Sequence, residues 1–232
     1  MNFDLPAGLT ARRARLVAAV AALAPRAERG AGVDLFAELE ADGLLAAPAD
    51  GLLGLVVDRD ATGGVAVALP DLEAAVRRAV GPESPPDAPV SALVAAGCLV
   101  DAATAAAVAA RLVDEAWRAL ADTAPHQGIR FAITEAAMAT HCARVAVHAA
   151  TALSPTSAAF AYQTLAVRLQ AVAAADAALH ATEAILLHAA PRLLAVLEGR
   201  IRALARQPLS AHDVRSLLGA AVHAGNFAGA TF

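Results

Sequence analysis

The chain contains no lysine and few aromatic residues, and both shortages narrow what it can be. All 18 of its basic side chains are arginine, and 22 Asp and Glu residues outnumber them, which gives a formal net charge of -4 at pH 7. Nucleic-acid binding proteins usually carry an excess of positive charge, so nucleic acid is not an expected partner. The only two cysteines, Cys98 and Cys142, predict neither a disulfide framework nor a metal site.

Uninterrupted apolar runs are also scarce. The longest stretch without a charged residue lies between Arg144 and Arg168, but hydroxyl side chains and the pair Ser154-Pro155 interrupt it, which does not suit a membrane span. The N-terminus lacks the basic region, apolar stretch and small-residue cleavage site that a secretory signal combines. We therefore expect a cytoplasmic location.

Alanine, leucine and valine supply most of the apolar content. Hydrophobic residues make up 58% of the 232 residues although aromatics make up only 3%. Alanine and leucine are the strongest helix formers, because neither loses much side-chain freedom on entering a helix. The composition therefore predicts an all-α fold with a sizeable core, in one large domain or two small ones.

The first third of the chain predicts an N-terminal helical region over residues 1–81. Apolar spacing indicates a helix over 10–29. A second short helix is expected after Asp34, which suits an N-cap, and before Gly43, which suits the left-handed residue that ends a helix. Residues 51–69 hold the only strand-like pattern, with valines around a Gly-Gly turn, and allow one small β-hairpin. A third helix is predicted to end at Gly81-Pro82.

A proline-rich linker at 82–89 precedes a C-terminal helical bundle at 90–232. Short breaks separate long helical patterns, so neighbouring helices are expected to run antiparallel, as in an up-and-down four-helix bundle. The predicted helices cover residues 90–121, 128–153, 155–187, 191–206 and 210–223.

Two blocks of sequence resemble the acyl-CoA dehydrogenase family. In the first block, the stretch Ala24-Pro25-Arg26-Ala27 is followed in the family's order by a helix ending in Gly-Leu-Leu at 43–45, a Gly63-Gly64 turn and a helix over 69–81. The second block, residues 90–187, resembles the first three helices of the family's C-terminal bundle. Only the linker stands where the family has its central β-domain, so the chain resembles a truncated homologue.

The resemblance implies a small-molecule acyl substrate, FAD as cofactor and assembly through the bundle. This chain departs from the family at the positions that bind the flavin. The β-domain that contacts the flavin ring has no counterpart. The family's phosphate-binding Arg is missing at its place, and Arg118 and Arg130 are the nearest candidates to bind a cofactor. The pair Glu198-Gly199 matches the catalytic Glu-Gly of many members. Because Arg202 follows Glu198 at helical spacing, an ordinary surface pair is the alternative.

Histidines form a second set of candidate catalytic residues. His141 and His148 share one face of a predicted helix, and His180 and Glu183 lie on the next helix. Antiparallel packing would bring the two sets together as a polar cluster suited to acid–base chemistry. The alternative is that each is solvated or singly hydrogen-bonded. Neither a di-iron nor a zinc ligand pattern is present, so no metal is expected.

Three functions follow from these observations. The first is an acyl-CoA-dehydrogenase-like enzyme of specialised metabolism that acts on an acyl thioester or a related small molecule, by redox or flavin-independent chemistry. The second is a non-catalytic subunit that partners a full-length acyl-CoA dehydrogenase homologue. The third is a helical interaction module. A homo-oligomer or a hetero-oligomer with such a homologue is the expected assembly.

Overall fold

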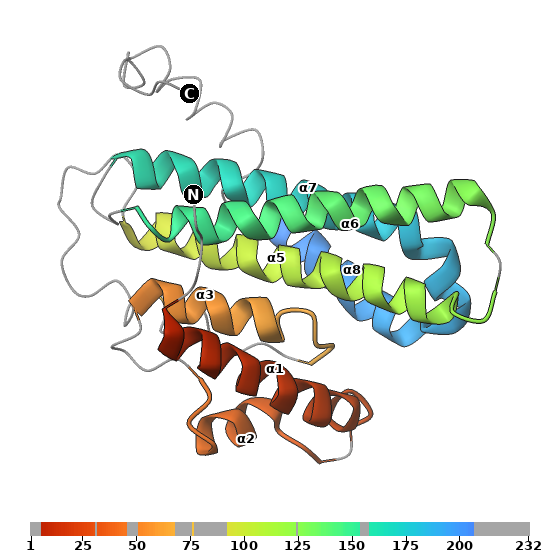
Figure 1. Cartoon of the computed structure of the whole chain (residues 1–232), viewed down its shortest axis with the longest axis horizontal. Coiled ribbons are helices and arrows are strands. Elements are labelled where there is room, and N and C mark those ends of the chain that lie inside the picture. Colours follow the sequence, from red (N-terminus) through yellow and green to blue (C-terminus); the bar gives the residue numbers. More distant parts are fainter. Residues whose placement is uncertain are drawn as a thin grey trace, which may run out of the picture.

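A computed structural model of the chain describes residues 6–30, 32–45, 51–67, 76, 92–123, 125–153 and 158–206. In this part of the chain every regular element is a helix, as the composition predicts, and no strand occurs (Figure 1). The helices are α1 (Ala7–Glu28), α2 (Leu35–Ala41), α3 (Gly51–Thr62), α5 (Ala92–Ala119), α6 (Gln127–Ala150), α7 (Ala158–Ala189) and α8 (Pro191–Arg206).

Helix α2 begins and ends where its flanking residues predict. The side chain of Asp34 accepts hydrogen bonds from the backbone N–H groups of Phe36 and Ala37, at 3.1 and 3.2 Å. These bonds satisfy two of the donors that have no partner within the first turn. Gly43 follows the helix with φ of 63°, a left-handed conformation that favours glycine.

The predicted β-hairpin at residues 51–69 is wrong, because α3 occupies residues 51–62. Leu52, Val56 and Val57 are buried in this helix, and so are the charged residues beside them. The β-branched valines lower intrinsic helix propensity only slightly, and burial on several sides outweighs that preference. The Gly63-Gly64 pair forms the turn that follows α3 rather than the tip of a hairpin.

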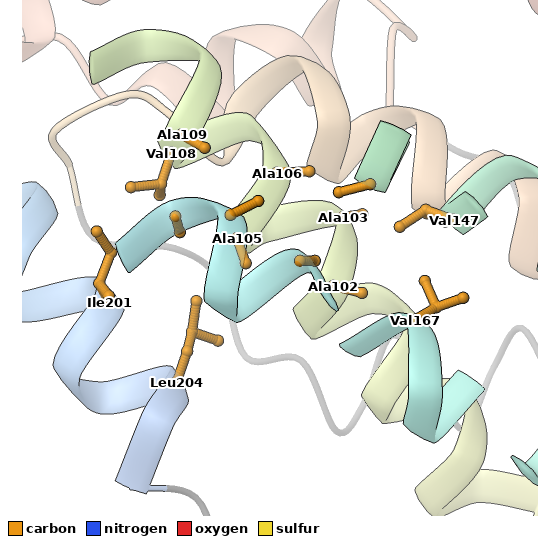
Figure 2. Packing of buried hydrophobic residues seen from close by; sticks show 14 of the residues in the cluster. Ala102, Ala103, Ala105, Ala106, Val108, Ala109, Val147, Val167, Ile201 and Leu204 are labelled. Carbon is orange, nitrogen blue, oxygen red and sulfur yellow. The ribbon is translucent and has the colours of Figure 1, made fainter. Parts of the chain in front are cut away.

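Helix α5 lies at the centre of the packed core. It contacts α3, α6, α7 and α8, and consecutive helices from α5 to α7 run in alternating directions (Figure 1). Small side chains let neighbouring helices approach α5 closely. Figure 2 shows buried alanines of α5 in one cluster with Val147 of α6, Val167 of α7, and Ile201 and Leu204 of α8. The labelled alanines of α5 are Ala102, Ala103, Ala105, Ala106 and Ala109.

The apolar composition of α5 also meets the test for a membrane span. Its segment Val94–Ala119 is long and apolar enough to cross a bilayer by length and composition. Of the 18-residue apolar stretch that meets this criterion, 83% is buried inside the structure. The core helix of a soluble protein has the same properties, so the test does not separate the two cases.

Two separate hydrophobic clusters divide the described residues. The larger is built on α5 to α8 with Leu52, Leu55 and Val56 of α3. The smaller joins α1 and α2 to residues near the end of α3, including Val65. Helix α3 therefore stands between the clusters, and its charged side chains are buried with it. We call the zone where α3 meets α1, α5 and α6 the ionic seam.

Several predicted segments lie outside the described residues. They are the helix over 69–81, of which only the buried and helical Val76 is described, the linker at 82–89 and the last helix at 210–223. The division of the chain into two domains therefore stays a prediction.

Candidate functional site

Three consecutive charged residues of α3, Asp58, Arg59 and Asp60, form the middle of the ionic seam. Their relative exposures are only 7%, 5% and 7%. Successive residues of a helix point about 100° apart, so each of the three faces a different neighbour. Buried charges are tolerated only when they are paired, and the pairing here reaches α1, α5 and α6.

Asp60 binds two arginines from two different helices. Both of its carboxylate oxygens accept from Arg144 of α6, from Nε and Nη2 at 2.7 Å each, and Oδ2 also accepts from Arg13 of α1 at 3.1 Å. Burial alone would raise the pKa of Asp60, but the hydrogen bonds and charge of Arg144 and Arg13 outweigh it and lower that pKa. Asp60 therefore stays ionised and joins α1, α3 and α6 at one carboxylate.

Asp58 is paired with Arg12 of α1. The Nη1 atom of Arg12 lies 2.8 Å from Oδ1 of Asp58 and 3.1 Å from the carbonyl oxygen of Leu44, and Nη2 donates to the carbonyl oxygen of Gly54 at 3.1 Å. Arg12 is only 8% exposed. One guanidinium thus connects α1, the segment after α2 and the first turn of α3.

Arg59 faces a second buried ion pair, between Asp101 of α5 and Arg168 of α7. Burial lowers the pKa of Arg59, and the charges of Asp58 and Asp101 oppose that shift. Arg168 reaches Asp101 at 3.4 Å and donates to the carbonyl oxygen of Leu204 at 2.6 Å. Cys98 lies in the same environment, and burial raises its pKa to about 11. Its thiol is therefore protonated at neutral pH and unsuited to act as a nucleophile.

Further polar contacts continue the ionic seam past the end of α3. Glu28 of α1 accepts from the backbone N–H of Ala66 at 2.9 Å and from Arg111 of α5 at 3.4 Å. Arg200 of α8 donates to the carbonyl oxygens of Gly63, Val65 and Val67. The segment after α3 is therefore held from both sides by side chains of distant helices.

His148 of α6 is the predicted site residue closest to this network. It is half-buried, and its Nδ1 atom is buried without a hydrogen-bond partner among the described residues. Burial lowers its pKa, the charge of Asp60 opposes the shift, and Arg13 and Arg144 reinforce it. The imidazole of His148 is consequently neutral at physiological pH.

The other residues of the predicted polar cluster are exposed. His141 of α6 and both His180 and Glu183 of α7 face solvent. The Nδ1 atom of His180 lies 2.8 Å from the carbonyl oxygen of Asp176 on its own helix, and this contact, with the Asp176 charge, raises the pKa of His180. No hydrogen bond or ion pair in the described residues joins these three side chains to one another or to His148. Packing of α6 on α7 thus leaves three of the four outside the core.

The remaining predicted site residues lie on the surface. Glu198 accepts from Arg202 one turn later, which is the surface pair that the spacing allows. Arg118 is largely exposed and lies 2.5 Å from Glu115. These ion pairs within single helices do not indicate a catalytic role for Glu198 or a cofactor-binding role for Arg118.

Arg130 has a different setting, because it lines an open hollow of about 490 Å³ where α6 begins. Phe131 and Thr134 line the same hollow, together with Pro125 and Gln127. The guanidinium and the exposed phenyl ring offer a positive charge beside an apolar surface. A cation beside an apolar ring has the chemistry to contact an anionic group or an aromatic side chain.

The ionic seam was not predicted from the sequence, although one signal was available. The segment Val56-Val57-Asp58-Arg59-Asp60 places three charges together inside an apolar stretch. A hairpin would have turned alternate charges to solvent, whereas a buried helix must pair all three. The signal becomes informative only when the segment is taken as helical.

No group of three or more His, Cys, Asp or Glu residues is placed to hold a metal ion in the part of the chain that the structure describes. Comparisons of this chain with protein-family models, with curated proteins and with solved structures found no match.

Proposed function

We propose that this chain is a helical interaction subunit that docks a helix of a partner protein along the outer face of α6. One observation carries the proposal: Phe131, Met138 and Val145 follow one another at seven-residue spacing and are 60%, 65% and 38% exposed. Single exposed apolar residues are common on protein surfaces, but a stripe along one helix marks an interaction face.

The spacing of the stripe suits a helical partner. Residues seven apart lie almost above one another on a helix, so the three side chains form a seam that another helix can follow. Cys142, which is also exposed, lies between Met138 and Val145 on the same side of α6. The hollow beside Arg130 and Phe131 lies at the beginning of the stripe and adds an Arg and an aromatic residue, the types enriched at binding hot spots.

The partner that we propose is the bundle of a full-length acyl-CoA dehydrogenase homologue. The order of helices in the described residues agrees with the resemblance noted in the sequence, since α1 and α2 precede a helical core built on α5 to α7. The Gly63-Gly64 turn lies between these two parts, as in the family's order. This agreement supports a shared helical architecture. It carries no information about the reaction, if any, that the chain catalyses.

Replacing Met138 by glutamate tests the proposal. A charge placed in the middle of the stripe has to be desolvated on docking, which should weaken the complex by roughly 2 kcal/mol or more, a factor of about 30 in Kd. Sedimentation velocity of the purified chain, mixed with an acyl-CoA dehydrogenase homologue from the same organism, measures complex formation. The matched control is Gln170→Glu, which adds the same charge at an exposed position of α7.

The outcomes separate three cases. A complex that Met138→Glu disrupts and Gln170→Glu preserves supports the proposal. A chain that self-associates through the stripe keeps the interaction surface but replaces the proposed partner with a second copy. A chain that stays monomeric alone and in the mixture contradicts the proposal.

A second candidate function is the acyl-CoA-dehydrogenase-like enzyme, and His148 is the residue that favours it. A neutral, half-buried imidazole near a carboxylate is suited to abstract a proton from an acyl thioester. Flavin absorbance of the purified chain tests the redox form of this hypothesis. Turnover of acyl thioesters by the wild type but not by His148→Gln tests the flavin-independent form.

A further inference from the structure

We propose that His148 is a pH-sensitive latch, whose protonation releases Arg13 from Asp60 and loosens α1 and α2 from the rest of the fold. The geometry of the ionic seam carries this inference. Among the described residues, α1 contacts α2 and α3, and it belongs to the smaller hydrophobic cluster rather than to the larger one. Its attachment to the core therefore depends on charged contacts, which are those of Arg12 and Arg13 with α3 and that of Glu28 with Arg111 of α5.

The carboxylate of Asp60 binds one arginine from α1 and one from α6. Arg144 holds it with two hydrogen bonds of 2.7 Å, whereas Arg13 holds it with one of 3.1 Å. The side chain of Arg13 is 38% exposed, so water can solvate its guanidinium when the contact breaks. Of the two arginines, Arg13 is the one that leaves at lower cost.

His148 lies one turn after Arg144 on α6 and senses the same charges. Asp60 from α3, Arg13 from α1 and Arg144 from α6 act on it, and Asp114 of α5 acts in turn on Arg144. Protonation, with the proton taken from solvent, would place a third cation around one carboxylate. The imidazolium repels both arginines and attracts Asp60, and the weakly held Arg13 is displaced.

The direction of the pH response follows from proton binding. In the closed form burial keeps the pKa of His148 below its ordinary value of 6.5, whereas in the opened form the ring is hydrated and regains that value. The opened form therefore binds more protons as the pH falls below about 6.5, and closure is favoured above this pH. The latch is closed at neutral pH and weakens progressively in mild acid.

Hydrogen–deuterium exchange of the full chain tests the latch. We compare exchange in α1 with exchange in α7 at about pH 7.5 and about pH 5.5, after correction for the intrinsic rate. In the wild type, α1 should exchange faster in acid relative to α7, by at most about tenfold, because about pH 5.5 lies one unit below the ordinary pKa of 6.5. His148→Gln, which has no titratable ring, should remove this difference.

His180→Gln is the matched control, because it removes an exposed histidine from α7 and should leave the response of α1 unchanged. Two outcomes would overturn the proposal. One is an acid response of α1 that persists in His148→Gln. The other is a wild type in which α1 and α7 lose protection together, since that describes global unfolding rather than release of α1.

Discussion

Replacing Asp60 by asparagine is expected to lower the free energy of unfolding by roughly 3–5 kcal/mol, the range measured when one partner of a buried ion pair is removed. Asp60 is 7% exposed and neutralises Arg144 and Arg13 together. The amide of asparagine keeps the shape of the side chain but cannot accept from Arg144 through both of its terminal atoms. The guanidinium of Arg144 would then lose its hydrogen-bonded carboxylate and keep only the charge of the exposed Asp114 of α5 near it.

Urea denaturation followed by circular dichroism measures this loss, which is a large part of the roughly 5–15 kcal/mol typical of a native domain. Glu198→Gln is the matched control, because it removes a carboxylate from an exposed pair with Arg202 and should cost less than about 1 kcal/mol. Equal losses in the two variants would contradict the structural role of the ionic seam.

Acid should narrow the difference between wild type and Asp60→Asn. The arginines lower the pKa of Asp60 below its ordinary value of 3.8. A carboxylate with a lowered pKa contributes its stabilisation above the unfolded-state value and loses it as the pH falls through the folded-state value. The gap between the two denaturation midpoints should therefore be constant near neutrality and shrink only in strong acid.

Local signals in the sequence explain why most helices can be predicted correctly. Pro191 begins α8 and Arg206 ends it, as expected, and Asp34 caps α2 with its own side chain. Such signals act within a few residues of the boundary that they set, so they are legible without knowledge of the fold. The alanine-rich composition adds the same preference throughout the chain.

The error at α3 has a different cause. Glycine and valine near residues 51–67 locally favour a hairpin. Burial between two hydrophobic clusters favours the helix instead, and that burial depends on residues far away in the sequence. The pairs Arg12–Asp58 and Asp60–Arg144 join residues 46 and 84 positions apart. Neither pair has a local signature, so the ionic seam becomes visible only once α1, α3 and α6 are placed together.

The histidines illustrate the limit of reasoning from helical spacing. His141 and His148 are seven residues apart, a spacing that predicts one shared face of α6, yet one is exposed and the other half-buried. Seven residues fall only about 20° short of two full turns, so the difference in exposure comes from the neighbouring helices: His148 lies one turn after Arg144, which binds Asp60 of α3. Spacing predicts which residues share a face, whereas the partners of that face follow from the packing of other helices.

Substituting alanine for Gly64 is expected to destabilise the fold by roughly 1–3 kcal/mol, the usual cost of adding a methyl group where no space exists. A Cβ atom at Gly64 would lie 2.8 Å from the carbonyl oxygen of Ala107 and 2.9 Å from the Cβ of Arg111. A backbone oxygen cannot move without disturbing α5, and Arg111 is also the partner of Glu28. The strain would therefore spread from the core helix into the ionic seam.

Gly97→Ala provides a control of opposite sign. Gly97 lies inside α5, and a Cβ atom at this position would have nothing within 4 Å, so alanine should raise stability by up to about 1 kcal/mol through its better helix propensity. Thermal and urea denaturation of the two variants should thus move the midpoints in opposite directions. If Gly64→Ala is neutral or stabilising, the segment after α3 is not in close contact with α5, and the attachment of α1 and α2 through the ionic seam has to be revised.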